Sequence, residues 1–473
     1  MENETKPRER ISFWSYFTGQ GMAMSFLTGM LTTYLMLNGI ALGQIALAMV
    51  LVKLWDAFSD TVFGVLFDKI HFKAGRSLPW LRIAMVVVPL MTVIVFNLPQ
   101  ALTPSQKLVW FAISYVLWDT AYTLSDVPIY NLVTLMTTST TERNSILSVA
   151  RMAALVGTFI ASMLATFMVS ERGGFTFGQT ALTLAVVMAV MMAPVGYVAK
   201  ERVPQLATTT TYTLRQMWQY VRQNKYLQRY YLYYIVSGMT WTASAVDLFV
   251  SYYFFGSALV STLTMLAMAV PMAILAPLMG MILKHVDKFR LFFWSAVATA
   301  ITTLFVYLGG THQLELYLML IALRSIPQGV VLTLNLTFTP DTVEYATFIS
   351  GLDARGIAFA IQSFAGKLIS LAQPLALFVL GRFAWTPIQA GSFAELSQRA
   401  VSQSASALNG LWFVATLLPA IGAGIALIPL CFYHLNDHDV QLMAAANAGK
   451  LSHEQAFAQL SSRIQKEVSI NGR

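Results

Sequence analysis

The chain has 473 residues, of which 56% are hydrophobic and only 11% charged, and its formal net charge is +8. An average soluble domain carries roughly 25% charged residues, so this composition excludes an ordinary soluble protein and indicates a polytopic membrane protein. Long apolar runs such as 83–98 also exclude a membrane β-barrel, whose strands alternate apolar and polar residues.

At about 20 apolar residues for each span, the sequence has room for about twelve membrane helices. The predicted spans are 12–38, 41–67, 79–98, 105–135, 145–170, 175–199, 229–256, 258–284, 289–309, 313–337, 351–384 and 406–434. The fold class is therefore an all-α integral membrane protein. The predicted parts are a six-helix bundle at 1–199, a cytoplasmic loop at 200–228, a second six-helix bundle at 229–434 and a cytoplasmic tail at 435–473, expected to be a solvated helix.

Basic residues gather in the loop around Arg76 and in the segment 200–229, whereas the loops 38–40 and 256–259 carry none. Because cytoplasmic loops are enriched in Lys and Arg, both termini are expected in the cytoplasm. The basic residues form no stripe with interleaved aromatic residues, so no nucleic-acid partner is expected. The expected surroundings are a lipid bilayer, namely the inner membrane of a bacterium, and the chain is expected to be a monomer.

Charged residues inside the second predicted span indicate a functional or structural role, because inserting each one into the membrane costs at least about 2.5–3.5 kcal/mol. Lys53, Asp56 and Asp60 are spaced by three and four residues, so they share one helix face. Two carboxylates one turn apart repel each other unless a cation lies between them. The pattern indicates a site for H⁺ or Na⁺, with a structural ion pair between Lys53 and Asp56 as the alternative.

The fourth predicted span carries Asp119 and Asp126, seven residues apart and nearly on one face, with Tyr122 between them. Carboxylates accept hydrogen bonds from sugar hydroxyls, and aromatic rings stack on the apolar face of a pyranose. Arg151 in the fifth span is able to bind substrate oxygens or to pair with either acid. In the second half, Gln362 and Lys367 belong to a polar face of the eleventh span.

Enzyme motifs are missing from the sequence: it contains no HExxH, no GxSxG, no cysteine-rich metal spacing and no Walker A motif. The DxxxD pattern at Asp56 and Asp60 also suits Mg²⁺-diphosphate chemistry. A membrane enzyme of that kind needs a second acid-rich motif, which this chain does not offer. We therefore expect no enzyme, no cofactor and no tightly bound metal.

Five stretches resemble one family in chain order. They are Trp55–Asp60, Phe72–Trp80, Ser125–Pro128, Pro340–Tyr345 and Gly356–Phe364. Together they are similar to the glycoside-pentoside-hexuronide:cation symporters, and in particular to their melibiose-permease-like members, which have the major facilitator fold. The resemblance implies symport of a sugar, glycoside or hexuronide with H⁺ or Na⁺ by alternating access, whereas an uncoupled sugar facilitator is the alternative.

Residue by residue, the resemblance implies a cation site and a sugar site. Asp56, Asp60 and Thr123 match the family's cation-binding positions. The positions that match sugar-site or cavity-lining residues are Asp126, Arg151, Tyr122, Tyr130, Gln362 and Lys367. Gly64, Asp68 and Lys69, with Arg76 in the same loop, resemble the superfamily's conformational loop motif after the second helix.

The sequence departs from the family pattern at three places, one of which is Thr61, where the family usually carries a proline after the second acid. Ser25 stands where melibiose-permease-like members carry a sugar-binding acid in the first helix, and Asp119 is a candidate for the missing carboxylate. Ser59 stands where those members carry an amide that binds Na⁺. With one Na⁺ ligand changed, the sequence favours H⁺ over Na⁺ as the coupling ion.

Overall fold

The computed structural model describes residues 4–69, 72, 75–203, 214–311, 313–351 and 355–471. Within these ranges, the side chains of residues 57–58, 60–69, 214–217, 219 and 469–471 lie outside the description. The described part of the chain is helical apart from two isolated bridges, Asn38 with Gln389 and Phe72 with Gly75. This confirms the all-α class that the sequence predicts.

The first half of the chain forms long helices. They are α1 (Pro7–Met36), α2 (Leu42–Lys69), α3 (Leu78–Val95), α4 (Pro104–Met136), α5 (Thr140–Val169) and α6 (Phe177–Val198). The second half begins with α7 (Leu214–Gln223), α8 (Lys225–Ser237), the 3₁₀ helix η1 (Gly238–Ala245), α9 (Asp247–Phe255), α10 (Val260–Ile282), α11 (Lys288–Gly309) and α12 (Leu314–Asn335). It ends with α13 (Phe338–Ser350), α14 (Arg355–Ile369), α15 (Ala372–Leu380), α16 (Phe393–Gln398), α17 (Ala405–Trp412), the π-helical turn η2 (Phe413–Leu417), α18 (Leu418–Leu430), α19 (Asp437–Asn447), α20 (His453–Gln459) and α21 (Ser462–Asn471).

Eight helical segments of the described chain are long and apolar enough to cross a membrane. They are α3, α5, α6, α10, α11, α12, the pair α14–α15 and the run α17–η2–α18. The helices α1, α2 and α4 are also long, with 30, 28 and 33 residues. These three carry the polar residues Gln20, Asp56 and Asp119, which lower their apolar content.

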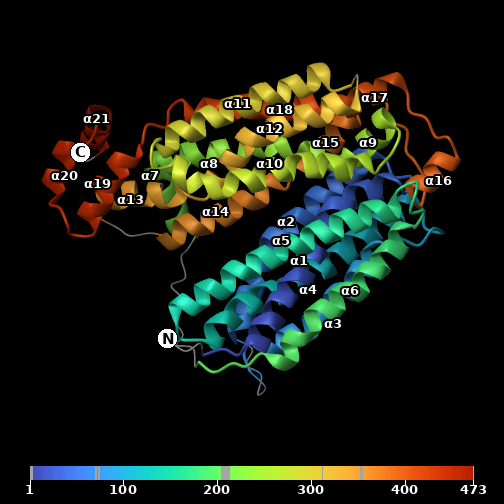
Figure 1. The fold of residues 1–473 in the computed structure, drawn as a ribbon, viewed down its shortest axis with the longest axis horizontal. Helices are drawn as coiled ribbons and strands as arrows, with labels where there is room; N and C mark the ends of the chain where they lie inside the picture. The colour runs from blue at the N-terminus through green and yellow to red at the C-terminus, as the bar shows by residue number, and fades with distance from the viewer. Residues whose placement is uncertain are drawn as a thin grey trace. The chain divides into compact units, whose positions relative to one another are not determined.

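The chain divides into two compact units. Unit 1 comprises Met1–Thr208, Ser244–Thr262 and Gln373–Leu411. In unit 1, α1 packs against α5 and α6, α3 packs against α4 and α6, and α2 packs against α4 (Figure 1). Unit 2 comprises Thr209–Ala243, Leu263–Ala372 and Trp412–Arg473, and there α11 packs against α12 and α18, while α8 packs against α14 and α18.

Glycine residues allow the close approach of α1 and α5. A Cβ atom at Gly21 would collide with the backbone of Ala154, and a Cβ atom at Gly157 would collide with the backbone of Thr18. Small residues at such crossings let membrane helices pack by van der Waals contact, because lipid provides no hydrophobic driving force between them. This crossing fixes the position of α1, whose residues Tyr16 and Gln20 face α4.

Two predicted spans of the second half contain irregular turns. The span 229–256 is divided into α8, the 3₁₀ helix η1 and α9, and the span 406–434 contains the π-helical turn η2. The two irregular turns meet in unit 2, where the hydroxyl of Thr242 donates a 3.1 Å hydrogen bond to the carbonyl oxygen of Val414. Mid-helix 3₁₀ and π turns are frequent at functional sites.

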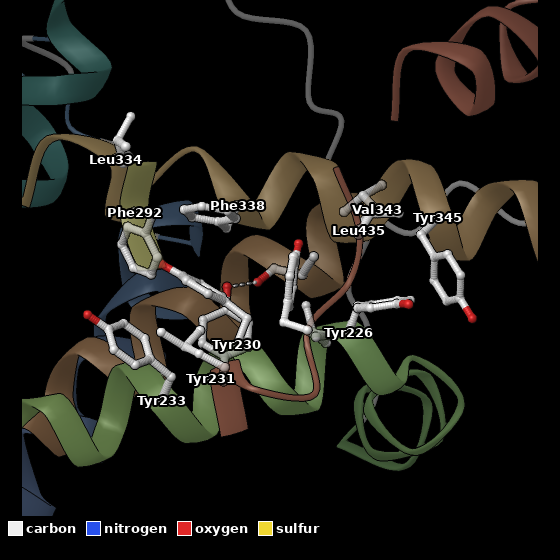
Figure 2. Close-up of a cluster of buried hydrophobic side chains, with 14 of the residues drawn as sticks. Tyr226, Tyr230, Tyr231, Tyr233, Phe292, Leu334, Phe338, Val343, Tyr345 and Leu435 are labelled. Atoms are coloured by element: carbon white, nitrogen blue, oxygen red, sulfur yellow. Dashed lines mark hydrogen bonds between the residues drawn. The ribbon is translucent and has the colours of Figure 1, made fainter. Parts of the chain in front are cut away.

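An aromatic core holds one end of unit 2 together (Figure 2). Tyr226 and Tyr230 of α8 are buried against Phe338, Tyr345 and rings from α11 and the segment after α18. Burying such a ring stabilises a fold by about 2–3 kcal/mol. The C-terminal helices join this core through the buried side chains Met443, Ala456 and Ile464.

The tail is helical as expected, but it consists of several short helices, a few of whose side chains pack against unit 2. Residues 437–471 form the short helices α19, α20 and α21, and α19 packs against α13. The ring of His453 stacks on Phe348 with centroids 3.9 Å apart, and its Nε2 lies 2.8 Å from the Phe348 carbonyl oxygen. The apolar residues of the tail are too few for a membrane span, but they are enough to cover the end of a bundle.

Candidate functional site

The first polar cluster of unit 1 lies between α1 and α4. Asp126 of α4 is half-buried, and one of its carboxylate oxygens accepts a 3.0 Å hydrogen bond from Nε2 of Gln20 on α1. One residue earlier on α4, the buried Ser125 hydroxyl lies 2.7 Å from the hydroxyl of Tyr16. Gln20 and Tyr16 are four residues apart, so one face of α1 presents both groups to α4.

Aromatic rings and a guanidinium surround this cluster. Tyr122 stacks on Trp118 with centroids 5.1 Å apart, and Tyr130 packs edge-on against Phe17 at 5.3 Å. Tyr130 lies within electrostatic range of both Asp126 and Arg151, and Arg151 is exposed on α5. Of the predicted sugar-site residues, the fold therefore gathers Asp126, Tyr122, Tyr130 and Arg151 around one place.

Gln20 is a member of this cluster that the sequence analysis missed. Its signal is present in the sequence, since it is an amide flanked by Gly19 and Gly21 inside an otherwise apolar part of α1. A buried amide in a membrane helix costs free energy unless it finds a hydrogen-bond partner, so it is as informative there as a charged residue.

The second polar cluster lies between α2 and α4. The buried hydroxyl of Ser59 donates a 2.8 Å hydrogen bond to Oδ2 of Asp119, and the hydroxyl of Thr123 donates to the Asp119 backbone oxygen at 3.0 Å. Lys53 lies within electrostatic range of Asp56 and Asp119, and its ammonium is 5.4 Å from the centroid of the Tyr115 ring. The cluster therefore combines two acids, one ammonium and two hydroxyls.

Asp119 belongs to this second cluster and not to the sugar-site cluster with which the sequence analysis grouped it. The sequence places Asp119 and Asp126 on nearly one helical face, but seven residues also separate them by about 10 Å along the axis. At that distance α4 meets different neighbours, α2 beside Asp119 and α1 beside Asp126. The backbone of Asp60 is helical, and its side chain lies outside the described residues.

Ser25 lies in the contact between α1 and α5. Its hydroxyl bonds to the backbone oxygen of Thr158 at 3.1 Å and to the hydroxyl of Ser162 at 2.8 Å. The residue is buried, and both partners belong to α5. A substrate contact at Ser25 stays a prediction, and the geometry gives its hydroxyl a helix-packing role.

The loop after α2 is tied to the end of α6. Glu201 accepts hydrogen bonds from the backbone N–H groups of Arg76, Ser77 and Leu78, at 2.7, 2.7 and 2.8 Å. A carboxylate at the first turn of α3 satisfies free N–H groups and complements the helix dipole. Of the predicted loop motif, Gly64, Asp68 and Lys69 belong to the end of α2, and the side chains of Asp68 and Lys69 lie outside the described residues.

The predicted residues of the second half lie in unit 2. Gln362 and Lys367 are half-buried on α14, and Oε1 of Gln362 is a buried acceptor without a hydrogen-bond partner among the described residues. Gly366 lies one turn after Gln362 and lines a cavity within unit 2. The part of α14 that lines this cavity is Gly366 and Ile369, whereas Gln362 and Lys367 are not among its lining residues.

Comparison with known proteins places the chain in a family. The model of a family described as MFS/sugar transport protein matches residues 15–437. The isoprimeverose transporter of Lactiplantibacillus pentosus is 23% identical over 434 residues, covering 88% of this chain and 87% of that protein. The glucuronide carrier protein homolog of Escherichia coli (strain K12) is 23% identical over 420 residues, covering 86% and 88% of the two chains.

Solved structures show the same fold. A bacterial homolog of the human lysosomal transporter Spinster, in an inward-facing and unoccupied conformation, superposes with a TM-score of 0.63 at 10% identity, covering 91% of this chain and 97% of that chain. The nucleoside transporter NupG gives a TM-score of 0.59 at 12% identity, covering 90% and 98%. The sequence matches confirm the resemblance to the glycoside-pentoside-hexuronide:cation symporters, and the protein is a transporter, not an enzyme. The chain belongs to the MFS/sugar transport protein family.

Proposed function

We propose that the protein is a secondary active transporter that couples entry of a sugar, glycoside or hexuronide to the entry of a cation, H⁺ in preference to Na⁺, by alternating access. The names of its relatives, an isoprimeverose transporter and a glucuronide carrier homolog, support a sugar or glycoside substrate. The proposal includes twelve membrane helices in two six-helix bundles, both termini in the cytoplasm, and a monomer in the bacterial inner membrane.

The observation that carries this proposal is the separation of polar side chains in unit 1 into two clusters on one helix. The cluster of Asp126, Gln20 and the neighbouring tyrosines offers hydroxyl-binding acceptors and aromatic faces, with Arg151 nearby. The cluster of Lys53, Asp56, Asp119 and Ser59 combines two acids with one ammonium, and the centroid of the Tyr115 ring lies 5.4 Å from that ammonium. We assign the first cluster to the sugar and the second, with Asp60 and Thr123, to the cation.

Coupling follows from the position of the two clusters on α4. A cation that neutralises an acid of the second cluster changes the balance of charge among Lys53, Asp56 and Asp119. That change alters the packing of α2 against α4 and, through α4, the orientation of Asp126. A coupling free energy of about 1–3 kcal/mol between two such sites is enough to change sugar affinity about 5- to 150-fold.

The test uses the full chain in proteoliposomes. Addition of a transported sugar is expected to drive H⁺ into the vesicles, whereas Na⁺ entry with no H⁺ movement would reassign the coupling ion. Asp60→Asn and Asp119→Asn are expected to abolish accumulation against a gradient. Downhill uptake without any cation movement would overturn the proposal in favour of an uncoupled facilitator. Full coupled accumulation by Asp60→Asn would show that Asp60 does not belong to the cation site.

A further inference from the structure

Unit 2 contains a cavity of about 210 Å³ inside its own helix bundle. This volume is large enough for several water molecules or for one sugar ring. Its walls come from α8, η1, α11, α12, α14 and α18. None of the acids or basic residues assigned to the cation and sugar clusters of unit 1 lines it.

Two amides on α12 face this cavity with unsatisfied oxygens. Gln328 and Asn335 are only 7% and 9% exposed, and Oε1 of Gln328 and Oδ1 of Asn335 have no hydrogen-bond partner among the described residues. The residues are seven apart, so both project from one face of the helix. A buried amide oxygen without a partner costs free energy, so an occupant of the cavity that donates a hydrogen bond to it gains stability.

The hydroxyl groups of the cavity wall also act as acceptors. Ser237 and Thr299 each donate to a backbone oxygen of their own helix, both at 2.8 Å, and Thr240 of η1 donates to the backbone oxygen of Ser237, the last residue of α8, at 2.7 Å. Each hydroxyl proton is therefore already engaged, and only oxygen lone pairs remain for an occupant. A complementary ligand supplies several O–H donors.

The lining contains no acidic or basic residue among the described residues that form it, but it contains the rings of Tyr233, Tyr234 and Trp241. An anionic sugar would lose its hydration here with no cation to compensate, which is costly. An uncharged ring with polar edges and an apolar face is complementary, because its hydroxyls reach the acceptors and its face contacts an aromatic ring.

The wall of the cavity is irregular where Thr240 and Trp241 contribute to it. Both residues belong to η1, the 3₁₀ interruption between α8 and α9. At membrane depth, irregular backbone is tolerated where it is buried in protein or lines a cavity. Interrupted helices of this kind commonly form the substrate sites of transporters.

We propose that this cavity binds one uncharged, hydroxyl-rich ring such as a pyranose. Gln328 and Asn335 accept hydrogen bonds from its hydroxyls, and the aromatic residues of α8 and η1 cover its apolar face. The assignment rests on the proposed sugar transport. It narrows the substrates of the transporter to sugars with an uncharged ring that can bind in the cavity of unit 2.

The experiment measures binding to the purified full-length protein by thermal shift and by titration calorimetry. The probes are D-glucose, D-xylose and D-galactose, each compared with D-glucuronate and with NaCl alone. At least one neutral sugar is expected to raise the Tm and D-glucuronate is not. Gln328→Leu combined with Asn335→Leu is expected to raise the Kd of that sugar at least tenfold, while the ligand-free Tm stays unchanged or rises because two unpaired amides are removed.

Two matched threonine variants on α11 control for a general loss of folding or stability. Thr299→Val removes a hydroxyl of the cavity wall and is expected to weaken binding several-fold. Thr303→Val makes the same change one turn away, where the hydroxyl donates to the Thr299 backbone oxygen and lines no part of the cavity, and is expected to leave the Kd unchanged.

Three results would overturn the inference: stabilisation by none of the neutral sugars, equal weakening by the two threonine variants, or Na⁺-dependent stabilisation that the amide variants lose. Uptake by Asp126→Asn tests the transport proposal separately. If Asp126→Asn transports normally while the amide variants lose neutral-sugar binding, the proposed sugar cluster of unit 1 fails and the unit 2 site stands.

Discussion

The side-chain amide of Gln20 on α1 donates a 3.0 Å hydrogen bond to the carboxylate of Asp126 on α4. This bond joins two helices that are far apart in the sequence, and it orients the acid assigned to the sugar. A hydrogen bond to a charged group contributes about 1.5–3 kcal/mol. We therefore expect Gln20→Leu to weaken sugar binding by about 10- to 100-fold.

The measurement for Gln20→Leu is the KM of sugar uptake in cells that contain equal amounts of protein. Gln44→Leu makes the same change at an exposed position of α2 and is the matched control. Wild-type KM in Gln20→Leu would show that the bond to Asp126 does not position the substrate.

The two clusters on α4 predict separable defects. Asp126→Asn is expected to weaken sugar binding while a cation still binds, because its partner Gln20 lies on α1. Asp119→Asn and Ser59→Ala are expected to impair cation-driven accumulation more strongly than sugar exchange at equilibrium, because their bond joins α4 to α2. Accumulation and exchange are measured side by side in proteoliposomes. Identical profiles for Asp119→Asn and Asp126→Asn would contradict the separation.

The crossing of α1 and α5 predicts a stability difference between two glycines of one helix. A Cβ atom at Gly21 would meet the Ala154 backbone, whereas a Cβ atom at Gly29 has no neighbour within 4 Å. We expect Gly21→Ala to destabilise the fold by about 1–3 kcal/mol through overpacking. Gly29→Ala is expected to be neutral or slightly stabilising. Thermal unfolding in detergent compares the two, and an equal Tm for both would show that α1 shifts freely.

Burial controls the ionisation of Asp341 on α13. Burial raises the pKa of this carboxyl group to about 6, although the ammonium of Lys288, 2.5 Å away, opposes the shift. The folded state therefore binds a proton more tightly than the unfolded state. The stabilising contribution is full below about pH 4 and is lost as the pH rises through 6.

A shift of about two units corresponds to at most about 3 kcal/mol. We expect titration of Asp341 to lower the Tm of the wild type as the pH rises from about 4 to 6. This decrease is expected to be absent from Asp341→Asn. Asp437→Asn, which leaves Asp341 in place, is the control and is expected to retain most of that decrease. The same pH profile in Asp341→Asn and the wild type would assign the titration to another group.

The loop between α1 and α2 pairs with the loop before α16 in unit 1. Asn38 and Gln389 form an antiparallel bridge, and the N–H of Gly39 donates to the Ile388 oxygen at 2.7 Å. Cα atoms of an antiparallel pair are about 4.5–5.5 Å apart, which is within the range of a disulfide. We expect Asn38→Cys with Gln389→Cys, in a Cys431→Ala background, to form a disulfide under oxidation.

Alternating access requires loops on one side of the membrane to separate during each cycle. The disulfide is therefore expected to stop uptake, and a reducing agent is expected to restore it. Each single-cysteine variant serves as a control. Normal uptake by the fully oxidised double variant would show that these loops stay together throughout transport.

The sequence by itself determined the membrane class, the basic loops, the family and the positions of acids within apolar helices. These features depend on composition and on spacing within one helix, which local sequence records directly. Asp126 and Tyr122 were identified in this way because a charge or a polar ring inside an apolar span is informative without knowledge of its neighbours.

Only the tertiary structure decided which helix each polar side chain meets. It placed Asp119 beside Ser59 on α2, gave Asp126 its partner Gln20, and put Ser25 against α5. It also showed that a few side chains of the tail are buried against unit 2 and that η1 and η2 interrupt two spans. These outcomes depend on contacts between residues far apart in sequence. The rotation of each helix, and the glycines that let two helices approach closely, determine which side chains become neighbours. The periodicity of a single helix does not encode this.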